Sequence, residues 1–399
     1  MADLLEGIRV MDFTHVHAGP LCTYQLALMG AEVIKVEPIE VGDQMRSMGV
    51  QLEPGISPGF LGQNADKRSL SIDLKSAEGL AIVRKLAKTA DVAVINMRPG
   101  TPERLQIDFE SIRALKPNIV YCQISGYGRS GPESDRPAFD HLVQGESGMF
   151  MATGLVNQPV RVGFAVVDAG TALVASSAIN AALLKRERTG EGSFLDVSML
   201  ESAMTLMGLN FYSYLATGRV GPRVGPNPLA TRGSAGTFLT LDKKYLMVNA
   251  NSHRLFERLA KAVDRSELTV DEKFNSPRAA HKNGPVLRQI FADLFATNTA
   301  DYWDRLLREA GVPVGQAKTP GEVLANPQFE YRQSLTRLDG VPGMADGLTV
   351  LNAGFTVDET PTAPSEPPPR LGQHSAELLL ELGYEQSAIA ELRARNIVQ

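Results

Sequence analysis

The chain has 399 residues, of which 43% are hydrophobic and 21% charged, and its formal net charge is −5. This length accommodates two domains and a large core, and the composition is that of a globular protein. The lack of excess basic residues excludes a protein built to follow nucleic-acid phosphates.

Two cysteines cannot build a disulfide framework, and the six histidines show no metal-ligand spacing. The first residues lack a basic segment followed by an apolar one, so no signal peptide is indicated. We therefore expect a cytoplasmic protein with no metal site.

The first 130 residues alternate short apolar runs with segments of helical length. We expect strands at 8–13, 32–37, 69–73, 92–95 and 119–124, and helices at 20–29 and 76–89. Gly30 follows the first helix and Pro38 ends the second run, which makes the first three elements a β-α-β unit with parallel strands. This alternation predicts an α/β domain with helices on both faces of a parallel sheet.

A single acid, Asp168, stands at the start of an apolar, small-residue run that continues to Leu184. Basic residues and then Gly190 follow, so a buried helix is predicted here rather than a membrane span. An acid at a helix start is ordinarily a cap. The alternative is a carboxylate nucleophile at a cleft. We expect the free N–H groups and the dipole of this helix end to keep it ionised.

The remaining chain is predicted to contain a smaller domain between two linkers. We expect a strand at 194–197, a helix at 201–215, a hairpin near 238, and amphipathic helices at 252–263, 285–296 and 300–310. The predicted division is a large domain over 1–200, a linker over 201–237, a smaller α+β domain over 238–325, a second linker over 326–351 and a return to the large domain over 352–399. The final helices, 375–382 and 386–395, are too short to form a domain and must dock on one.

Ligands of such sheets bind beyond the carboxyl ends of the strands. A dinucleotide site would need a Gly-rich loop after the first strand, where only Gly19 stands, although Glu37 occupies the place of a ribose-binding acid. Basic residues near these loops would instead suit an anionic, nucleotide-like ligand. They are Lys67, Arg68, Lys75, Arg98 and Arg104.

Segments spread over nearly the whole chain resemble the class III CoA-transferases, the CaiB–BaiF family that includes formyl-CoA:oxalate transferase. They include GIRVMDFTHVHAGP, LMGAEVIKVE, NADKRSLSIDLK, NMRPGTPERL, ISGYGRSGP, VDAGTA, AGVPVGQAKTPGEVLANPQF and PPPRLGQHSAELLLELGY. The resemblance implies a Rossmann-like large domain built from both chain ends, a smaller domain between them, and an interlocked, ring-like homodimer. It also implies acyl-CoA and a small carboxylic acid as substrates, with no tightly bound cofactor.

The same resemblance implies the site residues. Asp168 matches the nucleophile that forms mixed-anhydride and aspartyl-CoA thioester intermediates, and Asp140 and His17 lie near the reacting groups. The implied CoA contacts are His15, Ala18, Ile72, Lys75, Asn96, Met97, Arg98 and Arg104. Gly233 and Gly236 belong either to a short glycine loop that closes over the intermediate or to a plain linker. Pro38 replaces a CoA-binding arginine of the formyl-CoA enzyme.

Two other functions stay open at this point. An α-methylacyl-CoA racemase would need a histidine where Phe139 stands, and His141 is displaced from that position. A non-catalytic CoA-binding protein would bind CoA without exchanging it. For a transferase, small dicarboxylates such as succinate are the expected acids.

Overall fold

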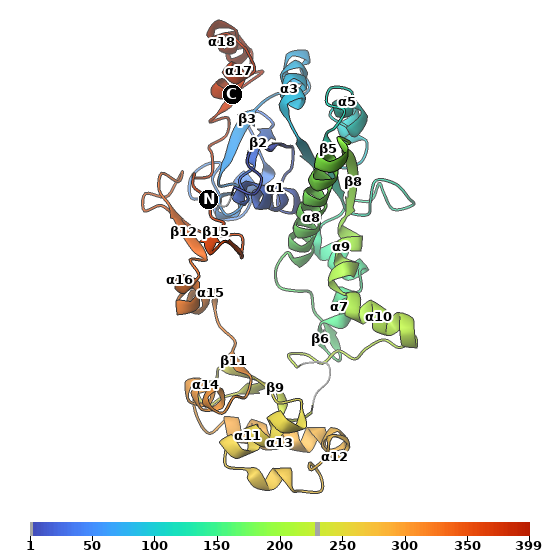
Figure 1. Ribbon diagram of the computed structural model, residues 1–399, viewed down its shortest axis with the longest axis vertical. Helices are drawn as coiled ribbons and strands as arrows, with labels where there is room; N and C mark the ends of the chain where they lie inside the picture. Colours follow the sequence, from blue (N-terminus) through green and yellow to red (C-terminus); the bar gives the residue numbers. More distant parts are fainter. Residues whose placement is uncertain (1–2, 228–231) are drawn as a thin grey trace. The chain divides into compact units, whose positions relative to one another are not determined.

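The computed structural model describes residues 3–227 and 232–399, which form two compact units (Figure 1). Unit 1 consists of Met1–Met149, Val162–Tyr212 and Pro327–Gln399. Unit 2 consists of Phe150–Arg161 and Ser213–Asn326. Unit 1 therefore combines both ends of the sequence, and the chain leaves it and returns.

A six-stranded parallel sheet forms the centre of unit 1. In spatial order its strands are β3 (Lys67–Ser71), β2 (Glu32–Glu37), β1 (Arg9–Asp12), β4 (Val92–Ile95), β5 (Val120–Ser125) and β8 (Ser193–Ser198). The predicted parallel α/β sheet is confirmed. The chain order reverses between β1 and β4, and this switch point is where open α/β sheets bind ligands.

Helices cover both faces of the sheet because neighbouring strand residues point to opposite sides and are apolar on both. Val10 of β1 belongs to the core formed with α1 (Ala18–Leu28) and α8 (Val166–Thr189). Met11, the next residue, belongs to the core formed with α3 (Ala77–Thr89), α17 (Ser375–Glu381) and α18 (Gln386–Ala394). Small residues on α1 and α8 let these two helices pack closely.

By length and composition α8 could cross a membrane, but half of its apolar window is buried inside the protein. Ala172, Ala175 and Ile179 are fully buried in the core shared with α1 and the sheet. This burial is the pattern of a core helix.

The C-terminal helices dock on edge strand β3, as their short length predicted. Arg68 of β3 bonds to Glu377 and Glu381 of α17. The last residues add a bridge between Ile72 and Val398. Arg68 is therefore held by carboxylates of the protein itself, and its assignment to an anionic ligand is wrong.

Unit 2 contains a three-stranded antiparallel sheet packed against helices. Its strands are β9 (Ala235–Leu239), β10 (Tyr245–Asn249) and β11 (Val314–Gln316), and its longer helices are α11 (His253–Ala262), α13 (Gly284–Phe295) and α14 (Ala300–Glu309). Its core contains Phe256, Phe291, Phe295 and Trp303. The predicted hairpin is confirmed as β9 and β10.

Two stretches differ from expectation. The helix predicted over 201–215 is divided into α9 (Met199–Leu206) and α10 (Gly208–Thr217), because α9 ends at Leu206 with Met207 as its C-cap, and Gly208 follows. Strands β12 (Leu335–Leu338) and β13 (Leu348–Leu351) form a hairpin within 326–351, where a linker was expected. Leu338 and Val350 are buried against Tyr24 and Phe60, so apolar packing holds this hairpin in unit 1.

The remaining elements are short. They are η1 (Gln44–Ser47), α2 (Pro58–Leu61), α4 (Thr101–Arg104), α5 (Phe109–Arg113), α6 (Asp140–Glu146), α7 (Met149–Ala152), β6 (Gly154–Leu155), β7 (Gln158–Pro159), η2 (Ser266–Thr269), α12 (Pro277–Lys282), α15 (Pro320–Leu324), α16 (Pro327–Tyr331), β14 (Thr356–Val357) and β15 (Thr360–Pro361).

Candidate active site

A cavity of about 460 Å³ opens in unit 1 at the carboxyl ends of β1, β4 and β5. It lies at the switch point of the sheet, where the loops after β1 and β4 separate. Most of the predicted site residues line it together: His15, His17, Ala18, Asn96, Met97, Arg98, Asp140 and Asp168. Residues more than 150 positions apart in the sequence thus meet in one pocket.

The other predicted residues do not line this cavity. Ile72 is buried beside the C-terminal strand residues, and Lys75 is exposed just before α3. Arg104 is exposed at the end of α4, whose first residue, Thr101, lines the cavity. They stay predictions as CoA contacts.

The two predicted loop glycines belong to unit 2. Gly236 lies within strand β9, and a Cβ there would come within 2.2 Å of the Arg288 guanidinium. A Cβ on Gly233 would come within 2.2 Å of the Gly284 carbonyl oxygen. Close packing accounts for both glycines, and their part in closing a site stays a prediction.

Helix α8 holds Asp168 in its first turn, with Ala165 rather than the acid at the N-cap position. The helix end is capped by another acid, since Asp140 Oδ2 accepts hydrogen bonds from the Val167 N–H at 2.8 Å and the Asp168 N–H at 3.0 Å. The local sequence could not reveal this cap, because Asp140 comes from α6, 28 residues earlier.

This arrangement changes the electrostatics of Asp168. Burial raises the pKa of Asp168 to about 6, the nearby His17 lowers it, and Asp140 adds to the rise. The expectation that helix N–H groups keep the carboxylate ionised is therefore wrong in its cause, since Asp140 occupies those groups. At pH 7 a pKa near 6 still leaves the ionised form in excess by about ten to one.

Gln144 fixes Asp140, and the sequence reasoning missed it. This buried side chain donates from Nε2 to Asp140 Oδ1, one helical turn earlier on α6, and to the Phe164 carbonyl at 3.2 Å. Its Oε1 accepts from the Val162 N–H at 2.9 Å. Gln144 thereby joins α6 to the segment that leads into α8. The i,i+4 spacing from Asp140 was the available signal.

The loop between β1 and α1 is held by side chains from other elements. Asn96 accepts from the His15 N–H at 2.9 Å and donates to the His15 carbonyl at 2.7 Å. Gln63 Nε2 donates to the Val16 carbonyl at 2.6 Å, and its Oε1 lies 2.8 Å from His17 Nδ1. Asn96, predicted as a CoA contact, thus also ties together the two loops at the switch point.

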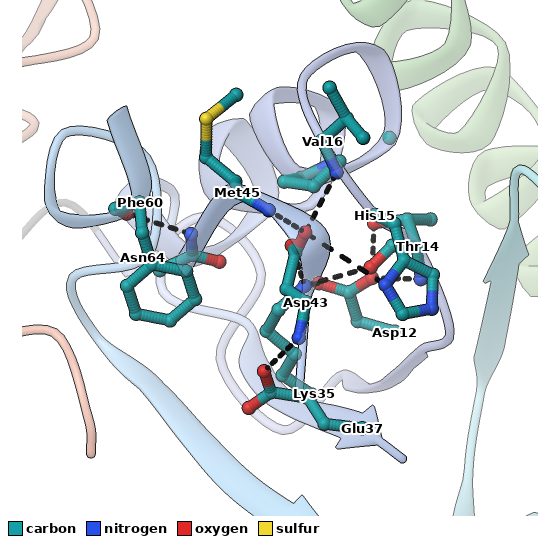
Figure 2. A network of polar contacts seen from close by, with 12 residues as sticks. Asp12, Thr14, His15, Val16, Lys35, Glu37, Asp43, Met45, Phe60 and Asn64 are labelled. Carbon is teal, nitrogen blue, oxygen red and sulfur yellow. Dashed lines mark hydrogen bonds and ion pairs between the residues drawn. The ribbon is translucent and has the colours of Figure 1, made fainter. Parts of the chain in front are cut away.

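Beneath this loop lies a fully buried group of charges (Figure 2). Lys35 Nζ lies 2.9 Å from Asp43 Oδ2, and Lys67 Nζ lies 3.1 Å from Asp12 Oδ2. Burial alone would raise the pKa of Asp12, but Lys35 and Lys67 hold it well below its usual value. Lys67 is therefore part of the core, and its assignment to an anionic ligand is wrong.

The structure removes the remaining support for a dinucleotide site, which was Glu37 as a ribose-binding acid. Glu37 forms a two-point ion pair with Arg46, at 2.8 Å on each oxygen, and accepts from Ser69 Oγ at 2.7 Å. The carboxylate is buried and occupied, so it cannot bind a ribose in this arrangement.

The racemase alternative gains no support from the pocket. Phe139 lines the cavity in the position where a racemase would carry histidine. His141 stacks on Phe139 with ring centroids 6.3 Å apart, but it is not among the residues that line the cavity.

Comparison with known proteins gives one consistent result. The sequence profile of CoA-transferase family III matches residues 5–375. The succinyl-CoA:glutarate CoA-transferase of Homo sapiens is 33% identical over 99% of this chain and 90% of its own length. The succinyl-CoA–D-citramalate CoA-transferase of Chloroflexus aurantiacus is 32% identical over 99% of this chain and 98% of its own length.

A solved structure agrees with these relatives. The crystal structure of a CAIB/BAIF family protein from Brucella suis superposes with a TM-score of 0.86 and 29% identity, covering 96% of this chain and all of that one. The relatives named above are CoA-transferases, and the profile match extends over nearly the whole chain. The chain therefore belongs to CoA-transferase family III and is an enzyme that transfers CoA from an acyl-CoA to a carboxylic acid.

Proposed function

We propose that Asp168 carries the acyl group and then CoA during transfer, and that the acids exchanged are small dicarboxylates. The supporting observation is the state of this carboxylate in the pocket. Within residues 3–227 and 232–399, no group donates a hydrogen bond to the Asp168 carboxylate, and its own helix end is capped by Asp140. A nucleophilic oxygen with free lone pairs is what attack on a thioester requires.

The chemistry runs in two symmetric halves. The Asp168 carboxylate attacks the acyl-CoA carbonyl, which forms a mixed anhydride and releases the CoA thiolate. The thiolate attacks the aspartyl carbonyl, so the donor acid leaves and an aspartyl-CoA thioester remains. The acceptor carboxylate attacks that thioester and releases the thiolate again. Attack of the thiolate on the acceptor carbonyl yields the new acyl-CoA and frees Asp168.

One arginine of the pocket is available to acidic substrates. Arg98 and Arg136 line the pocket together with the acids Asp140 and Asp168. Arg136 is bonded to Glu133 and Glu146, whereas no described residue bonds to the guanidinium of Arg98. The dicarboxylates in the names of the relatives, succinate, glutarate and citramalate, agree with this charge.

We extend the proposal to a homodimer on the strength of an apolar surface, and to a cytoplasmic location because both cysteines are free. The side chains of Leu173 and Val174 on α8 and of Leu206 on α9 are exposed and line one groove with Gly170. Contiguous apolar surface of this kind marks an interaction site. Sedimentation velocity tests the dimer, and a monomer at micromolar concentration would contradict it.

The test of the carrier is direct trapping. The wild-type protein is supplied with a panel of acyl-CoA donors and free acids, and the products are measured by mass spectrometry. Hydroxylamine is added during turnover with the best pair, because it converts an aspartyl thioester to a hydroxamate. We expect the modified peptide to contain Asp168. Efficient transfer with no modification of Asp168 would contradict the carrier.

A further inference from the structure

Val16 adopts a backbone conformation that its side chain disfavours. Its φ is +70°, in the left-handed region, where a β-branched residue is a genuine outlier. The residue lines the pocket between His15 and His17. Such strain persists only when surrounding groups impose it, and it concentrates at functional sites.

The contact that opposes relaxation of this strain comes from Asp43. Asp43 Oδ1 accepts from the Val16 N–H at 2.9 Å and from the Met45 N–H at 2.9 Å (Figure 2). The same oxygen lies 3.8 Å from His15 Nδ1. Asp43 thus connects the loop after β1 to the loop after β2, and Gln44, its neighbour, also lines the pocket.

Asp43 is itself held in place. Its side chain and that of Lys35 are fully buried, and their charged atoms are 2.9 Å apart. Lys35 Nζ also donates to the Thr14 carbonyl at 2.8 Å, and Glu37 Oε1 accepts from the Asp43 N–H at 2.9 Å. One buried lysine therefore anchors both the carboxylate and the start of the loop.

We propose that Asp43 is a positioning residue for CoA transfer: its carboxylate, paired with Lys35, holds Val16 in the left-handed conformation and thereby fixes His15 and His17 in the pocket. The inference rests on the proposed function only in taking this pocket as the place of transfer. The hydroxylamine experiment tests the carrier separately, so the two can fail independently.

The test measures kcat and KM of Asp43→Ala per folded protein, with the best donor and acceptor pair of the panel. We expect kcat to fall about 10- to 100-fold, because small displacements of pocket groups slow the reaction steeply. KM for the acyl-CoA should rise by a smaller factor than kcat falls, since Asp43 itself does not line the pocket. Asp43→Asn, which keeps an oxygen acceptor, should retain more of kcat than Asp43→Ala.

A second substitution tests the strain itself. Glycine adopts positive φ without cost, so Val16→Gly in the Asp43→Ala protein should raise kcat at least about threefold. If Asp43→Ala does not fold, Gln63→Leu removes the other side-chain hydrogen bond on Val16, together with the Gln63 contact to His17, and leaves the buried ion pairs intact. We expect the same loss of kcat from it.

The matched control is Asp66→Asn. The Asp66 carboxylate likewise accepts backbone N–H groups, those of Ser365 and Glu366, but it does not line the pocket. Its kcat should equal that of the wild-type protein. Wild-type kcat in a folded Asp43→Ala protein would overturn the proposal, as would a Val16→Gly substitution that leaves the Asp43→Ala protein no faster. If Asp43→Ala does not fold, wild-type kcat in both Asp43→Asn and Gln63→Leu would overturn it.

Discussion

The buried acids of unit 1 have pKa values shifted in opposite directions. Asp12 and Asp43 lie among lysines that hold their pKa values below the usual range despite burial. Asp168, in the pocket above them, has no lysine or arginine partner among the described residues, and burial raises its pKa to about 6. The first group is neutralised by lysines, whereas Asp168 is not, and this difference supports its proposed role as the carrier. The pocket is needed as a second criterion, because burial also raises the pKa of Asp66, which lies outside the pocket.

The largest effect should come from removing the isolated acid. Asp168→Ala should lower the transfer rate at least about 10⁴-fold, as loss of a covalent nucleophile does in other enzymes. The measurement is formation of new acyl-CoA at saturating substrates. Glu201→Gln is the matched control, because Glu201 occupies the same first-turn position on α9 and does not line the pocket. Near-normal transfer by Asp168→Ala would contradict the proposal that Asp168, unlike Asp12 and Asp43, takes part in the chemistry.

Breaking a neutralised pair should instead destabilise the folded protein. Lys67→Met leaves Asp12 with only the more distant Lys35, whose Nζ lies 3.9 Å from Asp12 Oδ2. We expect a loss of about 3–5 kcal/mol in the free energy of unfolding, the usual cost of an uncompensated buried charge. Urea titration measures it. Arg395→Met, which breaks the exposed pair with Glu78, should leave the urea midpoint nearly unchanged.

Removing the charge of Asp168 should stabilise the protein, whereas breaking the Lys67 pair destabilises it. The native pKa of about 6 lies above the ordinary 3.8, so the ionised carboxylate weakens the native state once the pH exceeds that ordinary value. Asp168→Asn should therefore raise the free energy of unfolding by up to about 3 kcal/mol at pH 7, since each pKa unit corresponds to about 1.4 kcal/mol. The gain is full above pH 6 and disappears toward pH 4. An equal gain at pH 4 and pH 7 would contradict this origin.

The smallest effect concerns the exposed bases. Arg104→Ala and Lys75→Ala should each raise KM for acyl-CoA several-fold and leave kcat at saturation unchanged, because they would bind substrate and transition state alike. Isothermal titration with CoA gives the binding change directly. Arg113→Ala, on the neighbouring short helix α5, serves as the control for loss of a surface arginine. Unchanged CoA affinity in both variants would contradict the prediction that Arg104 and Lys75 contact CoA.

Local sequence patterns determined the elements of unit 1. The runs at 32–37 and 92–95 are strands β2 and β4 with the predicted bounds, because apolar residues bounded by turn residues carry their own signal. The start of α8 near Asp168 was also readable, and the resemblance named the family. The break between α9 and α10 was not predicted, since its flanks are both apolar and helical in character.

Only the tertiary structure decided the roles of the charged residues. Strands β2 and β3, which contain Lys35 and Lys67, also contain other polar and charged residues, so the sequence does not single these lysines out as buried. Nor does the sequence show that Asp43 and Asp12 neutralise them in the core. The cap on α8 comes from Asp140, and the strain at Val16 is held by Asp43. Charge pairing depends on distances of 3–4 Å between atoms far apart in the sequence, and chain folding alone sets such distances.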